Sequence, residues 1–403
     1  MRLTAPIGLP ARALVLAAGF LVLFVGGGAR FGIGLTLKPM AEDLSWGRGE
    51  LGLAVALFQL VSASCMFVSG SLADRISLRR LFAGGLMIAA AGIGLMSLVT
   101  VPWHALALYG VLFAIGNGTA SIIPVGVMVT RVYPERAGFA NAVVSSGLSL
   151  GQLVMVAALA AVLVDLGWRS VYVWLGVAHL ALLVIALPMI PGRTSTAPPR
   201  AVRPAPPCGT TLRAAAGTRR FWLLLAIYAI CGFDDFFVST HVVAFAQDKG
   251  VDALLAGNLL ALMGLTALIG VLAAGAWSDH AGPVWPTAAA FAARIAVFTL
   301  IGLDQSAVSV AVFALVFGAT FLVTAPLTVI FVRDAFGTRQ LGALTGLITM
   351  VHHICGGLGA WLGAGIFDST GRYDPAFIIM LGSCVVALAL TFALRQPTDN
   401  KTA

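Results

Sequence analysis

Long apolar stretches alternate with short polar breaks over the whole chain. A helix needs about 20 mostly apolar residues to cross a bilayer. Twelve such stretches are predicted at residues 13–37, 50–72, 81–101, 105–129, 138–164, 170–190, 221–246, 253–276, 284–303, 307–331, 340–366 and 374–394. The pattern predicts an all-α integral membrane protein with twelve transmembrane helices, the first of which is too long for a signal peptide.

The longest polar break lies near the middle of the chain. Residues 191–220 are rich in proline and arginine, which is typical of a flexible linker. We therefore predict an N-terminal six-helix half at 1–190, a cytoplasmic linker at 191–220 and a C-terminal six-helix half at 221–403.

The two halves also resemble each other in sequence. Gly70-Ser-Leu-Ala-Asp74-Arg75 follows the second stretch, and Gly275-Ala-Trp-Ser-Asp279-His280 follows the eighth, 205 residues later. Repeated halves of parallel topology are typical of secondary transporters, which bind their substrate near the midplane between the halves. The repeat predicts two pseudo-symmetric halves around a central site.

Composition excludes several other classes of protein. Hydrophobic residues make up 60% of the chain and charged residues 10%, so a soluble globule would lack a charged surface. No zinc-protease, phosphate-loop or nucleotide-binding motif occurs, and the five cysteines are scattered. Gly147-Leu-Ser149-Leu-Gly151 matches a nucleophile elbow but lies inside a predicted span, where glycines four apart allow close helix packing. We expect no enzymatic activity, cofactor, metal or nucleic-acid partner.

The distribution of positive charge predicts the orientation. With the N-terminus inside, 17 Lys and Arg residues fall at the termini and on the cytoplasmic loops, whereas five fall on the opposite loops. Both termini are therefore expected in the cytoplasm. Arginine outnumbers lysine by 21 to 3, which favours a GC-rich bacterial source and hence a multi-pass protein of the bacterial inner membrane. The net charge of +8 is explained by cytoplasmic loops beside anionic membrane lipid.

One loop resembles the hallmark of a known family. Gly70-x-Leu72-Ala73-Asp74-Arg75, followed by Arg79-Arg80, is similar to the loop between helices two and three of the major facilitator superfamily. The resemblance implies alternating access by rocking of the halves. It also implies gating roles for Gly70, Asp74 and Arg75 and, through the repeat, for Gly275 and Asp279.

A narrower resemblance concerns the substrate. Gly28-Ala-Arg30-Phe-Gly32, Leu44-Ser-Trp46-Gly-Arg48 and Gly346-Leu-Ile-Thr-Met-Val-His352-His353 resemble the bacterial branch with monocarboxylate porters and oxalate:formate antiporters. In that branch a basic residue on helix eleven helps to bind carboxylate, and His352 stands at its place. This chain departs from many members at Val271, where they carry an arginine.

Few charged side chains lie within the predicted spans. An isolated charge at the bilayer centre costs about 2.5–3.5 kcal/mol on insertion scales. The repeat maps Arg30 of helix one onto Asp235 of helix seven, so the two are expected at similar depth and paired in the empty carrier. The alternatives for Arg30 are a structural ion pair or a binding site for a substrate carboxylate, which a guanidinium can hold through two parallel hydrogen bonds. Asp235 and Asp234 are candidates for proton coupling.

Histidines on helices seven and eleven are further candidates. His352 and His353 point about 100° apart on a helix, so only one is expected to face the cavity directly, and the resemblance favours His352. His241 lies nearly two turns after Asp235 and could share a proton route with it. The alternative for each histidine is a packed, hydrogen-bonded core residue.

Three other polar residues complete the set. Ser149 matches His352 in the repeat, and Asn117 lies on a predicted cavity-lining helix, so both are candidate binding residues, although helix–helix hydrogen bonding is their ordinary role. Arg294 lies mid-span on the peripheral helix nine. A packing or snorkelling role is expected for it, while an inward rotamer could serve the site that Val271 leaves empty.

These observations predict a secondary active transporter of a small organic anion, a monocarboxylate, coupled to protons or working by anion exchange. Its partners are the anion, protons and membrane lipid, and it is expected to act as a monomer. The alternative is proton-driven efflux of a hydrophobic compound. A transporter-like sensor or a membrane-embedded enzyme is a more remote alternative.

Overall fold

The computed structural model describes residues 9–133, 137–190, 210–337 and 341–394, and this part of the chain is helical with no strand. Eleven helices in it are long and apolar enough to cross a membrane. The longest, Ala140–Met189, has non-helical dihedral angles at Gly167 (φ 78°, ψ 172°) and therefore holds two crossings. The prediction of an all-α protein with twelve transmembrane helices is thus confirmed.

The N-terminal half contains six crossings, of which the first and the fourth are interrupted in mid-membrane. Its elements are α1 (Leu9–Ala29) with α2 (Gly32–Leu44), α3 (Arg48–Arg75), α4 (Leu78–Gly94) with η1 (Leu95–Leu98), the series α5 (Pro102–Ala105), η2 (Leu106–Phe113), α6 (Ala114–Thr119) and α7 (Ile122–Val132), and α8 (Ala137–Ala186) with η4 (Leu187–Met189). The predicted first span, 13–37, is too short, because α2 extends to Leu44.

The C-terminal half has the same order of crossings, although its first crossing, α10, is continuous. A short helix, α9 (Leu212–Ala216), precedes α10 (Arg219–Asp248), α11 (Ala253–Ala281), α12 (Val284–Leu303), α13 (Ala307–Phe321) with α14 (Thr324–Phe336), α15 (Leu341–Thr370) and α16 (Asp374–Ala393). The break between α13 and α14 corresponds to the break in the fourth crossing. Residues 191–209, most of the predicted linker, lie outside the described part of the chain.

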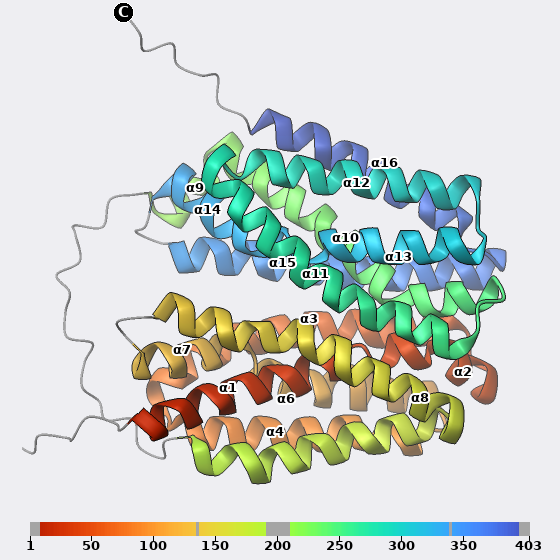
Figure 1. Ribbon diagram of the computed structural model, residues 1–403, viewed down its shortest axis with the longest axis horizontal. Helices are drawn as coiled ribbons and strands as arrows, with labels where there is room; N and C mark the ends of the chain where they lie inside the picture. Colours follow the sequence, from red (N-terminus) through yellow and green to blue (C-terminus); the bar gives the residue numbers. More distant parts are fainter. Residues whose placement is uncertain (1–8, 134–136, 191–209, 338–340, 395–403) are drawn as a thin grey trace, which may run out of the picture.

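The halves lie side by side along their length, as Figure 1 shows. Helix α3 runs from one end of the bundle to the other, so we name the two ends after its termini, the Arg48 end and the Arg75 end. At the Arg48 end the halves are joined through α2 with α10 and through α3 with α15.

Glycines set the closest helix contacts. At Gly151 a side chain would collide with the carbonyl of Phe24 on α1, and at Gly147 a Cβ would lie 2.7 Å from the Phe20 carbonyl. The two glycines of the elbow-like motif therefore allow α1 and α8 to approach closely, as the sequence predicted. This contact packs α1 tightly against α8 within the N-terminal half.

Candidate functional site

A cavity of about 110 Å³ lies at mid-depth between the halves, next to the interruption of the first crossing. Both halves contribute to its wall. Its lining residues are Arg30, Tyr228, Asp235, Phe236, Phe321, Leu322, Thr324, Thr328, Thr349, His352 and His353. Arg30 and Asp235, which the repeat predicted at comparable depth, thus lie on one cavity. The wall combines aromatic rings with a small set of polar groups, which is typical of small-molecule sites.

Arg30 follows the last residue of α1 and is the cavity's contribution from the N-terminal half. Its main chain is held by the Tyr109 hydroxyl, which donates a 2.8 Å hydrogen bond to the Arg30 carbonyl, and its guanidinium lies 4.7 Å from the centre of the Phe31 ring. Nε of Arg30 is buried without a hydrogen-bond partner. Such a donor loses its hydration without compensation until a ligand supplies an acceptor.

Asp235 pairs with Arg294 and not with Arg30, which corrects the expected pairing. Nη2 of Arg294 on α12 lies 2.6 Å from Oδ1 of Asp235, close but without a well-aligned hydrogen bond. Among the described residues, no acidic group lies within ion-pair distance of Arg30.

Arg294 is buried with 1% of its side chain exposed. It donates to the Thr320 hydroxyl (2.9 Å) and carbonyl (3.1 Å), and its guanidinium lies 4.6 Å from the Phe317 ring centre. Of the packing or snorkelling role expected for Arg294, the structure agrees with packing and not with snorkelling. Hydropathy places Arg294 in a span but does not give the direction of its side chain. Only its tertiary contacts with Asp235 of α10 and Thr320 of α13 showed its partner.

Both histidines of α15 line the cavity, which corrects the expectation that only one would. Nδ1 of His352 lies 3.2 Å from the Tyr228 carbonyl, and Nε2 lies 3.8 Å from Oδ2 of Asp235. His353 bonds the Thr349 carbonyl through Nδ1. The cavity wall therefore accommodates two adjacent side chains of one helix.

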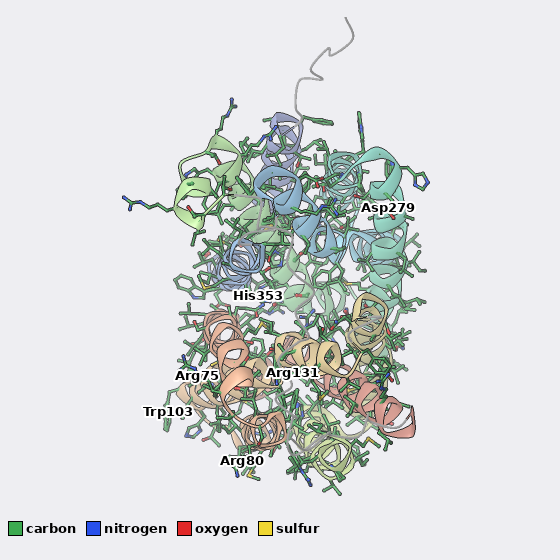
Figure 2. The ribbon with its side chains drawn as sticks, turned by 90° about the vertical axis from the view of Figure 1, so that its left-hand side faces the viewer. Arg75, Arg80, Trp103, Arg131, Asp279 and His353 are labelled. Carbon is green, nitrogen blue, oxygen red and sulfur yellow. The ribbon has the colours of Figure 1, made fainter. Side chains whose placement is uncertain are left out.

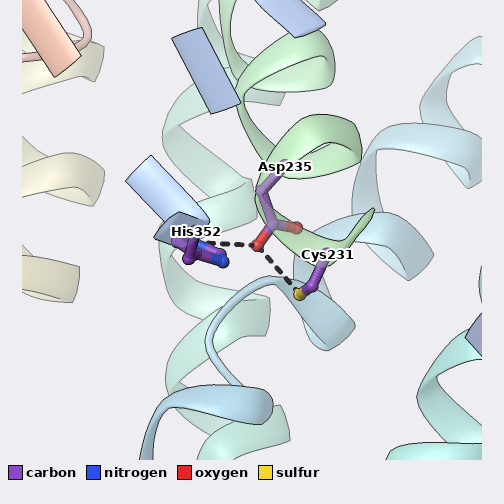
Figure 3. Close-up of side chains that lie close together, drawn as sticks. All are labelled: Cys231, Asp235 and His352. Atoms are coloured by element: carbon purple, nitrogen blue, oxygen red, sulfur yellow. Dashed lines mark hydrogen bonds and ion pairs between the residues drawn. The ribbon is translucent and has the colours of Figure 1, made fainter. Parts of the chain in front are cut away.

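A glycine allows the helices that carry Asp235 and His352 to approach each other closely. A Cβ at Gly232 of α10 would collide with the His352 carbonyl on α15. Because glycine permits this contact, Asp235, one turn further along α10, lies within reach of His352. Figure 3 shows Asp235 between His352 and Cys231, whose thiol lies 3.4 Å from the same carboxylate oxygen, Oδ2.

Asp234 and His241 lie away from the cavity. Asp234 faces α16, where Ser383 (2.8 Å) and the Cys384 thiol (3.1 Å) donate to its two oxygens. His241 has both ring nitrogens bonded, one to the Tyr373 hydroxyl (3.0 Å) and one to the Ala360 carbonyl (2.7 Å). The structure does not bring His241 and Asp235 onto one lining.

The predicted binding residues of the N-terminal half other than Arg30 also lie outside the cavity wall. Asn117 donates a 3.5 Å bond to the Gly26 carbonyl, which joins α6 to α1. Ser149 is buried where α8 meets α11, beside Gly264. Both are in contacts between helices, which is the ordinary role of such residues in a membrane.

The predicted gating residues lie at the Arg75 end. Figure 2 looks onto this end and shows Arg75 on one half and Asp279 on the other. Both side chains are exposed, and no ion pair joins them in the described structure. Gly70 and Asp74 lie in the last two turns of α3, and Gly275 lies in α11 with open space where its Cβ would be. The side chain of Asp74 is outside the described part.

A charged cluster at the Arg48 end joins the halves, and the sequence analysis missed it. Arg48 donates from Nη1 (2.6 Å) and Nη2 (2.9 Å) to the two oxygens of Asp248 at the end of α10. Lys38 of α2 lies 2.9 Å from Asp248. The main-chain amides of Arg48 and Gly49 donate to Asp368 of α15 at 2.8 and 2.6 Å. We call these five residues the latch.

The latch is also packed against aromatic side chains. The guanidinium of Arg48 stacks 3.6 Å from the Phe367 ring centre, and Nη1 donates to the Tyr373 hydroxyl at 2.8 Å. A planar guanidinium with a bidentate partner and a ring beneath it is strongly oriented. In the sequence, the latch is indicated only by charged residues of both signs in the loops at this end of the bundle. Charged loops are common, however, and which residues pair depends on the tertiary structure.

Comparison with known proteins identifies the family. A sequence profile described as Major Facilitator Superfamily matches residues 19–243 and 224–403. The chain belongs to this superfamily. An uncharacterized MFS-type transporter of Bacillus subtilis, YcxA, is 26% identical over 88% of this chain and 87% of its own length. Monocarboxylate transporter 13 of Rattus norvegicus is 26% identical over 85% of this chain and 77% of its own.

Solved structures agree on the fold of this facilitator. A point mutant of the nucleoside transporter NupG superposes with a TM-score of 0.78 at 13% identity over 96% of this chain and all of the other. A bacterial homolog of the human lysosomal transporter Spinster, inward-facing and occupied, gives 0.78 at 18% identity over 96% and 97%. These relatives and neighbours are transporters and not enzymes, so the chain is a multi-pass membrane transporter of small molecules.

Proposed function

We propose that this facilitator is a secondary active transporter of a small organic anion, a monocarboxylate, working by alternating access. The observations that carry the proposal are that Arg30 lines the central cavity without an acidic partner in the described structure and that its Nε is buried without a hydrogen-bond partner. The second buried arginine nearby, Arg294 on α12, is already neutralised by Asp235. The cavity therefore offers one arginine for one carboxylate.

The wall suits a small acid with an apolar body. A carboxylate can accept two parallel bonds from the Arg30 guanidinium. Phe236 and Phe321 supply apolar surface, while Thr324 and Thr328 line the same cavity. The names of the rat and human relatives, monocarboxylate transporters 13 and 11, agree with this substrate class.

Proton coupling is assigned to the contact between His352 and Asp235. The Tyr228 carbonyl can only accept, so Nδ1 of a neutral His352 carries the proton and Nε2 presents its lone pair. That lone pair faces Oδ2 of Asp235 at 3.8 Å, and two acceptors face each other favourably only with a positive species between them. A shared proton is such a species, and anion exchange without a proton is the alternative.

Substrate and proton would meet in this cavity. An anion bound at Arg30 adds negative charge beside His352 and Asp235, and this favours the protonated form of the pair. Asp234, hydrogen-bonded to neutral donors on α16, and His241 remain secondary candidates for a proton route.

The latch supports an alternating-access cycle with the present state closed at the Arg48 end. Positive charge on the loops favours the cytoplasm for the Arg75 end, so this state is inward-facing in the proposed orientation. In the opposite state the motif of Gly70, Asp74 and Arg75, with its echo at Gly275 and Asp279, would close the cytoplasmic end.

Efflux of a hydrophobic compound is the second candidate. The aromatic rings of Tyr228, Phe236 and Phe321 on the wall favour it. A local match points the same way, since the multidrug resistance protein MdtH of Yersinia pestis is 31% identical over 22% of this chain and 20% of its own. A hydrophobic cation would be repelled by the free charge of Arg30, so the anion is preferred.

Substrate binding to purified protein tests the proposal. Thermal-shift assays against short monocarboxylates should identify ligands that stabilise the folded carrier. Arg30→Gln should weaken binding by roughly 10- to 150-fold, because a hydrogen bond to a charged group contributes about 1.5–3 kcal/mol. Arg169→Gln is the matched control, since Arg169 is an exposed arginine paired with Asp43 at the Arg48 end. Unchanged affinity in Arg30→Gln would refute the anion site, and stabilisation only by hydrophobic compounds would favour efflux.

A further inference from the structure

The cluster of Cys231, Asp235 and His352 combines three different metal-ligating groups beside the cavity (Figure 3). One ligand atom from each lies within 4.8 Å of the others. We propose that this cluster is a binding site for a borderline or soft divalent cation such as Zn²⁺, which would occupy the place assigned above to the coupling proton and arrest the carrier.

The distances suit a tetrahedral ion. With metal–ligand bonds of about 2.0–2.3 Å, the sulfur and the carboxylate oxygen of a tetrahedral site lie about 3.5 Å apart, and the nitrogen and the oxygen about 3.4 Å. Sγ of Cys231 is 3.4 Å from Oδ2 of Asp235, and Nε2 of His352 is 3.8 Å from it. The third pair, Sγ of Cys231 and Nε2 of His352, lies within 4.8 Å, so the His352 ring must move towards Cys231 to complete the geometry.

The lone pairs point the right way. His352 is fixed through Nδ1 by the Tyr228 carbonyl, which is the arrangement that holds metal-ligating histidines in the tautomer that binds through Nε2. Asp235 uses Oδ1 for Arg294 and leaves Oδ2 towards the cluster. Arg294 then acts as the outer partner of a ligating carboxylate, so the existing ion pair need not break.

The charge balance is also favourable. Binding replaces the thiol proton of Cys231, which leaves to water in the cavity, with the metal ion. Arg294 and the divalent ion then carry three positive charges against two negative charges from Asp235 and the thiolate. The remaining positive charge faces the cavity, where a water molecule or a carboxylate can fill the fourth position.

The donor set selects among ions. Thiolate and imidazole ligands suit Zn²⁺, Co²⁺ and Cd²⁺, whereas Mg²⁺ and Ca²⁺ prefer oxygen. Because Asp235 and His352 line the cavity, an ion can arrive from there without crossing the core. A bound ion would hold α10 to α15 and block the site for the proton.

Metal binding to purified protein without any anion tests the site. Zn²⁺ should raise the melting temperature while Mg²⁺ should not, and Co²⁺ should give the visible and thiolate charge-transfer bands of a tetrahedral site. Cys231→Ser and His352→Ala should each weaken binding at least tenfold. Cys355→Ser, a half-buried cysteine elsewhere on α15, and His353→Ala should bind as the natural chain does.

The outcomes separate this site from the proposed function. Stabilisation by Zn²⁺ that persists in both Cys231→Ser and His352→Ala, or no Co²⁺ thiolate band in the natural chain, would overturn the metal site. Neither result depends on Arg30, so the proposed anion site is tested separately by anion binding to Arg30→Gln. Asp235→Asn is avoided because it would leave Arg294 buried without its counter-ion. In vesicles, Zn²⁺ should inhibit uptake by the natural chain. For Cys231→Ser, the same inhibition should require at least a tenfold higher Zn²⁺ concentration.

Discussion

The latch should control which end of the carrier is closed, and Asp248→Asn tests this directly. Asp248 receives both Nη atoms of Arg48 and the ammonium of Lys38, all from the opposite half of the protein. Because these contacts cross between the halves, they exist only while the Arg48 end is closed. Their loss should therefore raise the free energy of that state more than it affects the fold of either half.

The magnitude follows from burial. The Arg48 side chain is 7% exposed and that of Asp248 is 20% exposed. An exposed ion pair contributes about 0–1 kcal/mol, whereas breaking a fully buried one costs about 3–5 kcal/mol. An intermediate cost of about 2 kcal/mol is expected here, and at about 1.4 kcal/mol per tenfold this shifts the equilibrium roughly 30-fold towards opening of the Arg48 end.

Spin labels across the Arg48 end can measure this shift. Leu166 on α8 and Leu303 on α12 are 62% and 83% exposed and belong to different halves. In a background with the five native cysteines replaced, Asp248→Asn should add a population at longer distance between labels at these positions. Asp43→Asn is the control, because Asp43 pairs with Arg169 of its own half at the same end. An unchanged distance distribution in Asp248→Asn would refute the reasoning.

Three further predictions concern the core and the topology. Either Asp235→Asn or Arg294→Gln should lower stability by about 3–5 kcal/mol in unfolding assays, and the double variant should recover part of the loss, since no charge stays unpaired; additive losses would contradict this. Gly232→Ala should destabilise the carrier by more than about 2 kcal/mol, whereas Gly302→Ala, where a Cβ meets open space, should be tolerated. Cysteine at position 203 should resist impermeant thiol reagents in intact cells, and labelling there would contradict the predicted orientation.

The predicted spans agreed with the helices more closely than the predicted site residues agreed with the cavity. Hydropathy counts apolar residues along one segment and therefore finds a crossing without knowing its neighbours. It missed the break after Ala29, because the residues around Arg30 continue the apolar run on both sides of the break. The repeat did place Arg30 and Asp235 on one cavity, because both halves fold alike.

The partners of the buried charges could not be predicted in this way. The pairing of Asp235 with Arg294 joins residues 59 positions apart on two helices whose neighbourhood depends on the packing of the whole C-terminal half. Similarly, the latch brings Arg48, Asp248 and Asp368 together from three helices. Considered alone, the latch charges look like ordinary loop residues and Arg294 like a peripheral one.

The sequence by itself determined that this chain crosses a membrane twelve times in two related halves and belongs to a transporter family. The physical reason is that lipid requires each span to satisfy its own backbone and to be apolar over about 20 residues, whatever surrounds it. Only the tertiary structure decided that Arg30 is the unpaired cation of the cavity and that Arg294 holds Asp235. Ion pairing depends on side-chain direction within a few ångströms, and that direction is fixed by contacts between helices distant in the chain.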